Sequence, residues 1–142
     1  MTAKTIYTAQ VHTVGGREGA AKSADGQLDV KLSTPGLGRP GTNPEQLFAA
    51  GWSACFEGAL GLVAKQFGVT LPAETAVDAR VELHFGEAEG YFLTAGLDVT
   101  IPGVADDVAE RMIAIAHETC PYSKMTRDGI EASVTLRSTA QA

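Results

Sequence analysis

The alternation of apolar and polar residues predicts three strands in the first third of the chain. Residues 4–14 alternate loosely, and residues 20–23 and 27–33 flank an Asp-Gly turn at 25–26 that favours a β-hairpin. A glycine-rich segment, 15–19, separates the first strand from this hairpin, because paired glycines tolerate positive φ. The pattern therefore predicts three consecutive, mainly antiparallel strands.

A long apolar stretch then predicts a helix from Pro44 to about Phe67. Asn43 is suited to cap its start, Gln46 stands at the capping-box position, and Gly68 is suited to end it. The helix is apolar nearly all round, which predicts burial on most sides. One stripe holds only small residues, which let a second helix approach closely: Ala50, Ala54, Gly58 and Gly61. At about 36 Å, such a helix is too large for one small domain to cover, and it indicates a dimer.

Two further strands, 76–85 and 91–101, precede a second helix over 105–119 and a last strand over 130–137. The predicted order is βββ–α–ββ–α–β, an α+β fold with antiparallel sheets around long buried helices. No repeat or linker divides the sequence, so residues 1–142 are expected to form a single domain.

Charge and composition narrow the possible partners. The chain has 17 acidic and 11 basic residues, a net charge of −6, and no run of Lys or Arg. We therefore expect neither nucleic acid nor an anionic membrane surface as the main partner. The N-terminal residues, MTAKTIYTAQVHTV, have no apolar core region and no cleavage site, so no secretory signal is expected. The most apolar stretch, 47–63, is interrupted by Ser53, Glu57 and glycines, and is expected to be too short and too polar to span a bilayer.

Two cysteines carry the candidate chemistry. Cys55 lies in the middle of the apolar helix, and Cys120 ends the second helix before Pro121. In a chain without an export signal, such cysteines are expected to be reduced, catalytic or inert, and not a permanent staple. The chain has three histidines, His12, His84 and His117, and they do not show the spacing of metal ligands. No metal site is therefore expected.

Two interpretations of Cys55 stay open at this point. A plain buried thiol is an inert, packed hydrophobe with a raised pKa, whereas a nucleophile needs a nearby positive charge or helix N-terminus. Arg17, on the glycine turn, is the candidate cation. Glu45 either favours the helix dipole or orients this arginine by a bidentate pair. Since Glu45 and Cys55 are about 15 Å apart along one helix, a shared site needs a long arginine bridge, a helix break or, as we favour, a second subunit.

Cys120 also has two interpretations. It is either packed in the core, or it is a resolving thiol that captures a sulfenic acid formed at Cys55. The second requires that the two Cα atoms lie within about 4.4–6.8 Å. The turn from Pro121 is suited to begin a new helical segment, whose backbone N–H groups would point back toward the sulfur.

Several motifs resemble the organic hydroperoxide resistance (Ohr) family, within the wider OsmC-like superfamily. The matching segments are GTNPEQLFAAGWSACF at 41–56, CPYSKMTR at 120–127, GGREG at 15–19 and DGQLDVKLSTP at 25–35. The resemblance covers essentially the whole chain in the right order. The sequence CPYS, instead of the CPVS-like version of OsmC proper, places it on the Ohr side.

The resemblance implies a cytoplasmic, bacterial thiol peroxidase that works as an intertwined homodimer, with active sites at the subunit interface. Cys55 matches the cysteine that attacks the peroxide and Cys120 the one that resolves it, while Arg17 and Glu45 match the residues that activate the thiolate. The implied substrates are organic and lipid hydroperoxides. The implied reductant is a dihydrolipoyl group, as in dihydrolipoamide or a lipoylated carrier protein, and no metal, haem or flavin is bound.

Two local features depart from the family pattern. The loop 34–41 looks shorter than usual and carries Arg39 before a proline, and Trp52 stands where tyrosine is more usual. We expect Phe48 and Met125 to contribute to an apolar setting for the thiol.

Three other functions remain open: an OsmC-type peroxidase with broader peroxide use, a non-catalytic dimeric binding module for apolar ligands, and a redox sensor.

Overall fold

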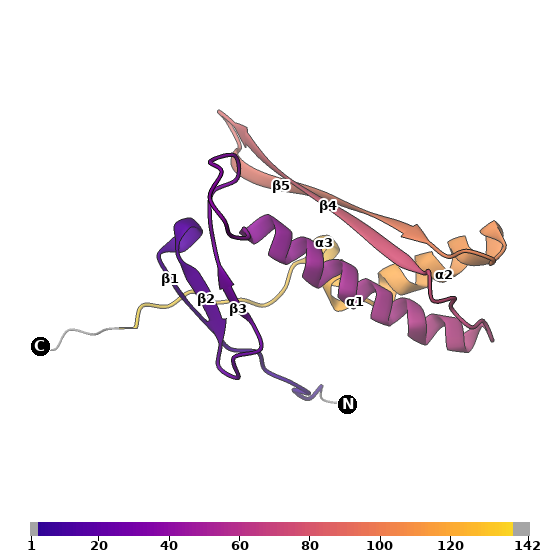
Figure 1. Cartoon of the computed structure of the whole chain (residues 1–142). Coiled ribbons are helices and arrows are strands. Elements are labelled where there is room, and N and C mark those ends of the chain that lie inside the picture. Colours follow the sequence, from indigo (N-terminus) through magenta and orange to yellow (C-terminus); the bar gives the residue numbers. More distant parts are fainter. Residues whose placement is uncertain (1–2, 138–142) are drawn as a thin grey trace, which may run out of the picture. The chain divides into compact units, whose positions relative to one another are not determined.

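Figure 1 shows the computed structural model of the chain, which describes residues 3–137. The elements follow the order βββ–α–ββ–αα, with a 3₁₀ turn after the first strand. The residues group into two compact units. One holds the chain up to Gly51 together with Ala79–Leu97, and the other holds Trp52–Asp78 and the residues from Asp98 onward. The predicted α+β class is confirmed, and each unit is described by itself below.

The first unit contains a three-stranded antiparallel sheet. Its strands are β1 (Val11–Val14), β2 (Ala20–Ser23) and β3 (Asp29–Lys31), in that spatial order. Gly26 has a φ of 77° in the turn between β2 and β3. The predicted hairpin is thus confirmed, whereas the first strand begins later than the predicted 4–14.

Between β1 and β2, the glycine-rich segment forms the 3₁₀ turn η1 (Gly16–Glu18). Gly15 and Gly16 have φ values of 86° and 58°, in the left-handed region that favours glycine. A Cβ at Gly19 would overlap with the carbonyl oxygen of Val14. These glycines therefore fix the tight turn on which Arg17 is carried.

The long helix α1 (Pro44–Gln66) begins and ends where the sequence predicts. The Asn43 side chain accepts a hydrogen bond from the Gln46 backbone N–H at 2.9 Å, which is the predicted cap. The other half of the capping box is replaced, because the Gln46 side-chain oxygen accepts from the Thr42 hydroxyl at 2.7 Å. At the far end, Gly68 has a φ of 68° and stops the helix.

The prediction that α1 is buried on most sides was wrong for the single chain. Its buried side chains come from one side and the middle to C-terminal part of the helix: Trp52, Phe56, Ala59, Leu60, Val63 and Ala64. The small-residue stripe is largely exposed at Ala54 and Gly58, and Leu62 is 59% exposed. The reason is that a chain of this size has too few other elements to surround a helix of 23 residues.

The expectation that this segment is too short and too polar for a membrane is also corrected. By length and composition alone α1 is long and apolar enough to cross one, because the helix extends beyond the apolar run at both ends. In its most apolar window 33% of the residues are buried inside the structure. The core helix of a soluble protein passes the same test, so α1 is weak evidence for a span.

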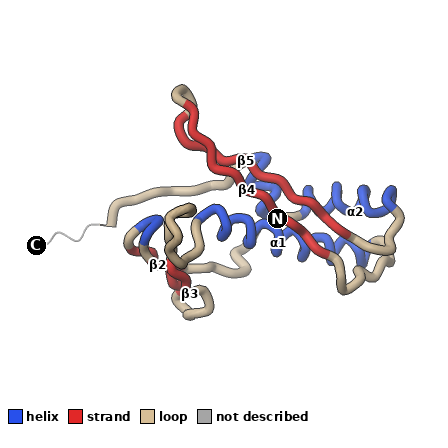
Figure 2. The backbone as a smooth tube through the Cα atoms, turned by 45° about the horizontal axis from the view of Figure 1, so that its top comes forward, coloured by secondary structure: helices blue, strands red, loops and turns tan. Residues whose placement is uncertain are grey.

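A second, two-stranded antiparallel sheet consists of β4 (Ala76–Gly86) and β5 (Gly90–Thr100), which pair as a long hairpin (Figure 2). Gly90 closes the turn with a φ of 75°. Both strands lie within one residue of the predicted bounds at every end. This hairpin is therefore well encoded by its alternating pattern.

In the second unit, α2 (Asp106–Thr119) and α3 (Pro121–Asp128) meet at Cys120. The Cys120 N–H donates to the Ala116 carbonyl at 2.8 Å, and the Cys120 carbonyl accepts from the Lys124 N–H at 3.0 Å. Cys120 thus ends one helix and caps the next, and Pro121 fits the first position of α3 because no hydrogen bond is required of its nitrogen there. The helix suggested after Pro121 is present.

The predicted last strand over 130–137 was wrong. These residues form no strand within the described part of the chain, and their apolar side chains are exposed, with Val134 at 102% and Leu136 at 91%. A strand needs a neighbouring edge for its backbone groups, and the pattern of one segment does not supply that edge.

Candidate functional site

The two cysteines, 65 positions apart in sequence, lie against each other in the second unit. Both are free thiols; Cys55 is half-buried on α1 and Cys120 is fully buried between α2 and α3. The protonated Cys55 thiol hydrogen-bonds to Cys120. The two thiols are therefore near each other, as a disulfide between them requires.

The surroundings raise the pKa of the Cys55 thiol. The largest cause is burial, which disfavours the thiolate, followed by the hydrogen bond to Cys120. One group acts in the opposite direction: the backbone N–H of Tyr122 donates to the Cys55 sulfur and lowers the pKa. Within one chain the balance therefore favours the thiol over the thiolate.

The Tyr122 N–H belongs to the first turn of α3, where helix N–H groups have no partner inside the helix. We expected this turn to point toward Cys120, which precedes it. Its Tyr122 N–H donates to the sulfur of Cys55, and the orientation of the turn toward Cys120 stays a prediction. The helix start that Pro121 permits thus provides a donor for the other cysteine of the pair.

A buried hydrogen bond lies beside this thiol pair. The indole N–H of Trp52 donates to the Ser123 hydroxyl at 3.0 Å. Trp52 is 6% exposed and Ser123 is fully buried. The sequence noted Trp52 only as a local change and did not single out Ser123, since a contact over 71 positions has no local signal.

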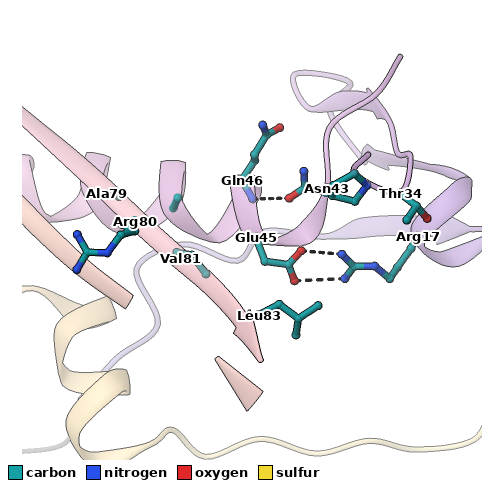
Figure 3. A pocket seen from close by; sticks show the side chains of 11 residues that line it. Arg17, Thr34, Asn43, Glu45, Gln46, Ala79, Arg80, Val81 and Leu83 are labelled. Atoms are coloured by element: carbon teal, nitrogen blue, oxygen red, sulfur yellow. Dashed lines mark hydrogen bonds and ion pairs between the residues drawn. The ribbon is translucent and has the colours of Figure 1, made fainter. Parts of the chain in front are cut away.

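The second predicted pair, Arg17 and Glu45, lies in the first unit. The two side chains form a bidentate ion pair, with nitrogen–oxygen distances of 2.6 and 3.3 Å (Figure 3). The arginine comes from the η1 turn and the glutamate from the first turn of α1. The hydrogen bond to Arg17 lowers the pKa of Glu45, and the same bond raises the pKa of Arg17. Both groups are therefore charged at neutral pH.

This ion pair borders a cavity of about 700 Å³ within the first unit (Figure 3). Apolar side chains form part of its wall, contributed by the loop after β3, by α1 and by β4: Pro35, Ala49, Ala79, Val81 and Leu83. Thr34, Asn43 and Arg80 are among its polar residues. The cavity thus offers a guanidinium beside an apolar surface.

A carboxylate missed by the sequence holds the neighbouring loop. Glu18, next to Arg17, accepts hydrogen bonds from the Thr34 backbone N–H at 2.8 Å and from the Thr34 hydroxyl, and pairs with Arg39 at 2.7 Å. The bonds from Thr34 are the main reason that the pKa of Glu18 is lowered. Arg39, noted only as a departure from the family pattern, therefore ties the loop 34–41 to the turn that carries Arg17.

The four predicted site residues thus form two pairs, Arg17 with Glu45 and Cys55 with Cys120, one pair in each unit. Phe48 and Met125 are both partly buried, in different units, and their part in the setting of the thiol stays a prediction. Among residues 3–137, no cluster of His, Cys, Asp or Glu is arranged to hold a metal ion.

Comparison with known proteins extends over nearly the whole chain. Residues 17–135 match the family model of OsmC-like proteins. The chain is 45% identical to an organic hydroperoxide resistance protein of Xanthomonas axonopodis pv. citri, over 94% of this chain and 96% of that protein. It is 40% identical to the organic hydroperoxide resistance protein OhrB of Bacillus subtilis, over 93% of this chain and 98% of that protein.

Solved structures give the same result for the fold. The crystal structure of Bacillus subtilis OhrB matches with a TM-score of 0.81, covering 87% of this chain and 93% of that one. The structure of an organic hydroperoxide resistance protein from Elizabethkingia anophelis, 44% identical, matches with a TM-score of 0.80 over 91% of this chain and 94% of that one. The chain therefore belongs to the organic hydroperoxide resistance (Ohr) family of OsmC-like proteins.

Proposed function

We propose that this protein is a thiol peroxidase that reduces organic hydroperoxides to alcohols. Its relatives named organic hydroperoxide resistance proteins support a role in hydroperoxide resistance. The observation that carries the thiol mechanism is the contact between Cys55 and Cys120, with the Tyr122 N–H donating to the Cys55 sulfur. This contact supports a mechanism in which Cys55 is the nucleophile, Cys120 resolves the oxidised sulfur and the Tyr122 N–H stabilises the anion.

The proposed reaction has two steps on the protein. The Cys55 thiolate attacks the distal oxygen of the hydroperoxide, the O–O bond breaks, and the alcohol leaves after taking up a proton, which leaves a sulfenic acid on Cys55. The Cys120 thiol then attacks this sulfur, and a Cys55–Cys120 disulfide forms with release of water. A dihydrolipoyl dithiol reduces the disulfide by thiol–disulfide exchange and is itself oxidised to the cyclic disulfide.

Arg17 is proposed to lower the pKa of the Cys55 thiol and to stabilise the negative charge on the leaving oxygen, with Glu45 fixing its orientation. Within one chain, burial and Cys120 raise the pKa of Cys55, so an additional positive charge is needed. Glu45 and Cys55 are separated by about 15 Å along the unbroken α1. We therefore propose that a second subunit of a homodimer brings Arg17 to the thiol.

The exposed apolar surface of the single chain supports a homodimer. Large apolar side chains that are more than 60% exposed occur up to the end of β1, on the β4–β5 hairpin and after α3: Ile6, Tyr7, Val14, Phe85, Tyr91, Ile130, Val134 and Leu136. A partner subunit that covered these side chains would remove their apolar surface from water, which favours association. The exposed small-residue stripe of α1 adds a surface that a second helix can approach closely.

The proposed substrates are hydroperoxides with an apolar body. The cavity beside Arg17 and Glu45 places aliphatic side chains next to the guanidinium. Each buried CH₂ group of a substrate contributes about 0.8 kcal/mol to binding, which favours such substrates over hydrogen peroxide. Dihydrolipoamide or a lipoylated carrier protein as reductant, and the cytoplasm as location, are part of this proposal.

Peptide mapping after a single addition of peroxide tests the thiol mechanism. Reduced protein that receives one equivalent of tert-butyl hydroperoxide is expected to lose two thiols and to yield a Cys55–Cys120 disulfide. Cys120→Ser is expected to leave a sulfenic acid at Cys55, which dimedone traps. If the thiols are instead inert and packed, as in a binding module for apolar ligands, both cysteines stay reduced, and that result would refute the proposal.

A further inference from the structure

Two hydrogen bonds join the same face of α1 to the first turn of α3. Trp52 and Cys55 are three positions apart on α1, so their side chains lie on neighbouring parts of one face. Ser123 and Tyr122 are adjacent in the first turn of α3. The indole N–H donates from α1 to α3, at the Ser123 hydroxyl, and the Tyr122 N–H donates back from α3 to the Cys55 sulfur.

We propose that Trp52 is a positioning residue for the reactive thiol, because its bond to Ser123 holds the start of α3 where the Tyr122 N–H meets the Cys55 sulfur. This inference rests on the proposed function of Cys55. Backbone N–H groups at a helix start stabilise an anion only if they point at it, and the strength of such a bond falls steeply with misalignment. A fixed anchor one residue away sets that alignment.

Burial explains why this bond is suited to an anchor. Trp52 is 6% exposed and Ser123 is fully buried, so neither group exchanges its partner for bulk water at low cost. On its other side, the Ser123 carbonyl accepts from the Thr126 hydroxyl at 2.7 Å, a bond that stays within α3. Ser123 therefore has one bond that secures the helix itself and one that ties the helix to α1.

The bond from Trp52 to Ser123 and the bond from Thr126 to Ser123 can be removed separately, which allows a matched test. Trp52→Phe keeps an apolar ring but removes the donor, Ser123→Ala removes the acceptor, and the double variant removes both. Thr126→Val is the control, because it weakens α3 without touching the link to α1. Each reduced full-length variant is treated with iodoacetamide across a range of pH, and the modification of Cys55 is followed by peptide mass spectrometry.

Both single variants are expected to show a higher apparent pKa of Cys55 than the wild type and, at pH 7, a rate of Cys55 modification about five-fold lower. The double variant is expected to match the single ones, because all three lose the same bond. Thr126→Val is expected to stay within about two-fold of the wild type. Circular dichroism and the thermal midpoint establish that each variant is folded; should Trp52→Phe not fold, Ser123→Ala still gives the comparison with the control.

An unchanged apparent pKa in Ser123→Ala would overturn the proposal, as would an equal shift in Thr126→Val. Peroxide turnover by the wild type is measured separately. A wild type without turnover contradicts the proposed function, while the modification of Cys55 still shows whether Trp52 positions the thiol. If the wild type turns over peroxide but the apparent pKa and modification rate of Cys55 are the same in the variants as in the wild type, the result contradicts this inference alone.

Discussion

Arg17 and Glu45 are 28 positions apart, and their side chains nevertheless form a two-fold hydrogen-bonded ion pair. The glutamate side chain is 17% exposed, whereas the arginine side chain is 42% exposed, so solvent weakens the contribution of the pair to folding. The ion pair is therefore expected to orient the Arg17 guanidinium more than to stabilise the fold, because Glu45 fixes the plane of the guanidinium.

Glu45→Gln is expected to lower turnover of an organic hydroperoxide about ten-fold at pH 7, since the neutral amide holds Arg17 less firmly. The same change is expected to alter the free energy of unfolding by only about 0.5 kcal/mol, measured with urea. Glu57→Gln, which changes an exposed carboxylate on the same helix, is the control. Equal turnover in Glu45→Gln and Glu57→Gln would contradict the role given to Glu45.

The pH dependence of the pair follows from the direction of its pKa shift. Because Arg17 lowers the pKa of Glu45, the pair contributes stability at neutral pH and above the ordinary pKa of a glutamate. That contribution is lost only as the pH falls through the lowered pKa of the folded state, below the ordinary range.

Glu18 gives a second prediction for a single residue. Glu18→Gln is expected to speed hydrogen exchange at the Thr34 amide, since the charged acceptor of that N–H is lost. In the wild type the protection is expected to fall as the pH drops through the lowered pKa of Glu18. Asp25→Asn serves as a control because Asp25 accepts the Gln27 N–H in a different turn. Identical Thr34 exchange in wild type and Glu18→Gln would show that Glu18 does not hold the loop.

At the scale of single residues, the candidate site residues could be predicted from the sequence, but few of their side-chain contacts could. Cys55, Cys120, Arg17 and Glu45 were recognisable from their local motifs, and the bidentate pair was one of two roles considered for Glu45. Their predicted roles in catalysis await experiment. The bonds of Trp52 to Ser123 and of Glu18 to Thr34 were not predicted, because each joins segments whose approach depends on the whole fold.

The elements themselves were largely encoded by local signals. Asn43, Pro44 and Gly68 correctly marked the ends of α1, and Pro121 correctly marked the change from α2 to α3. The last strand over 130–137 was wrong because strand formation depends on an edge elsewhere in the fold. The exposure of α1 was misjudged for a related reason, since apolar character shows what a helix can bury but not what is available to cover it.

The η1 turn provides a prediction at the level of elements. Gly19→Ala is expected to destabilise the protein by about 2 kcal/mol or more, since the new Cβ overlaps with the Val14 carbonyl and the turn has to shift. Gly26→Ala, with a φ of 77° but open space around it, is expected to cost about 1 kcal/mol. Urea unfolding measures both, and a smaller loss in Gly19→Ala than in Gly26→Ala would contradict this account of the turn.

For the whole molecule, the proposed homodimer makes a prediction about mixed subunits. Cys55→Ser and Arg17→Met are each expected to be inactive alone. When the two variants are unfolded and refolded together, the mixed dimers combine an intact Cys55 on one chain with an intact Arg17 on the other. If Arg17 acts across the interface, turnover is expected to return to about a quarter of the wild-type value.

The same mixture also separates the alternatives for the site. No recovery, although size-exclusion chromatography with light scattering shows mixed dimers, would mean that Arg17 acts on the thiol of its own chain. A chain that is monomeric at all concentrations would remove the dimer from the proposal and leave the exposed apolar surface without an explanation.

The central claim is that Cys55 reduces organic hydroperoxides, and the most direct test is peroxide consumption with dihydrolipoamide as reductant. Wild type and Cys55→Ser are compared with tert-butyl hydroperoxide and with hydrogen peroxide. We predict fast turnover of the organic peroxide by the wild type, slower turnover of hydrogen peroxide, and loss of both in Cys55→Ser. Comparable rates with both peroxides would indicate an OsmC-type enzyme of broader use. Wild-type turnover that persists in Cys55→Ser, or no turnover with either peroxide, would contradict the account.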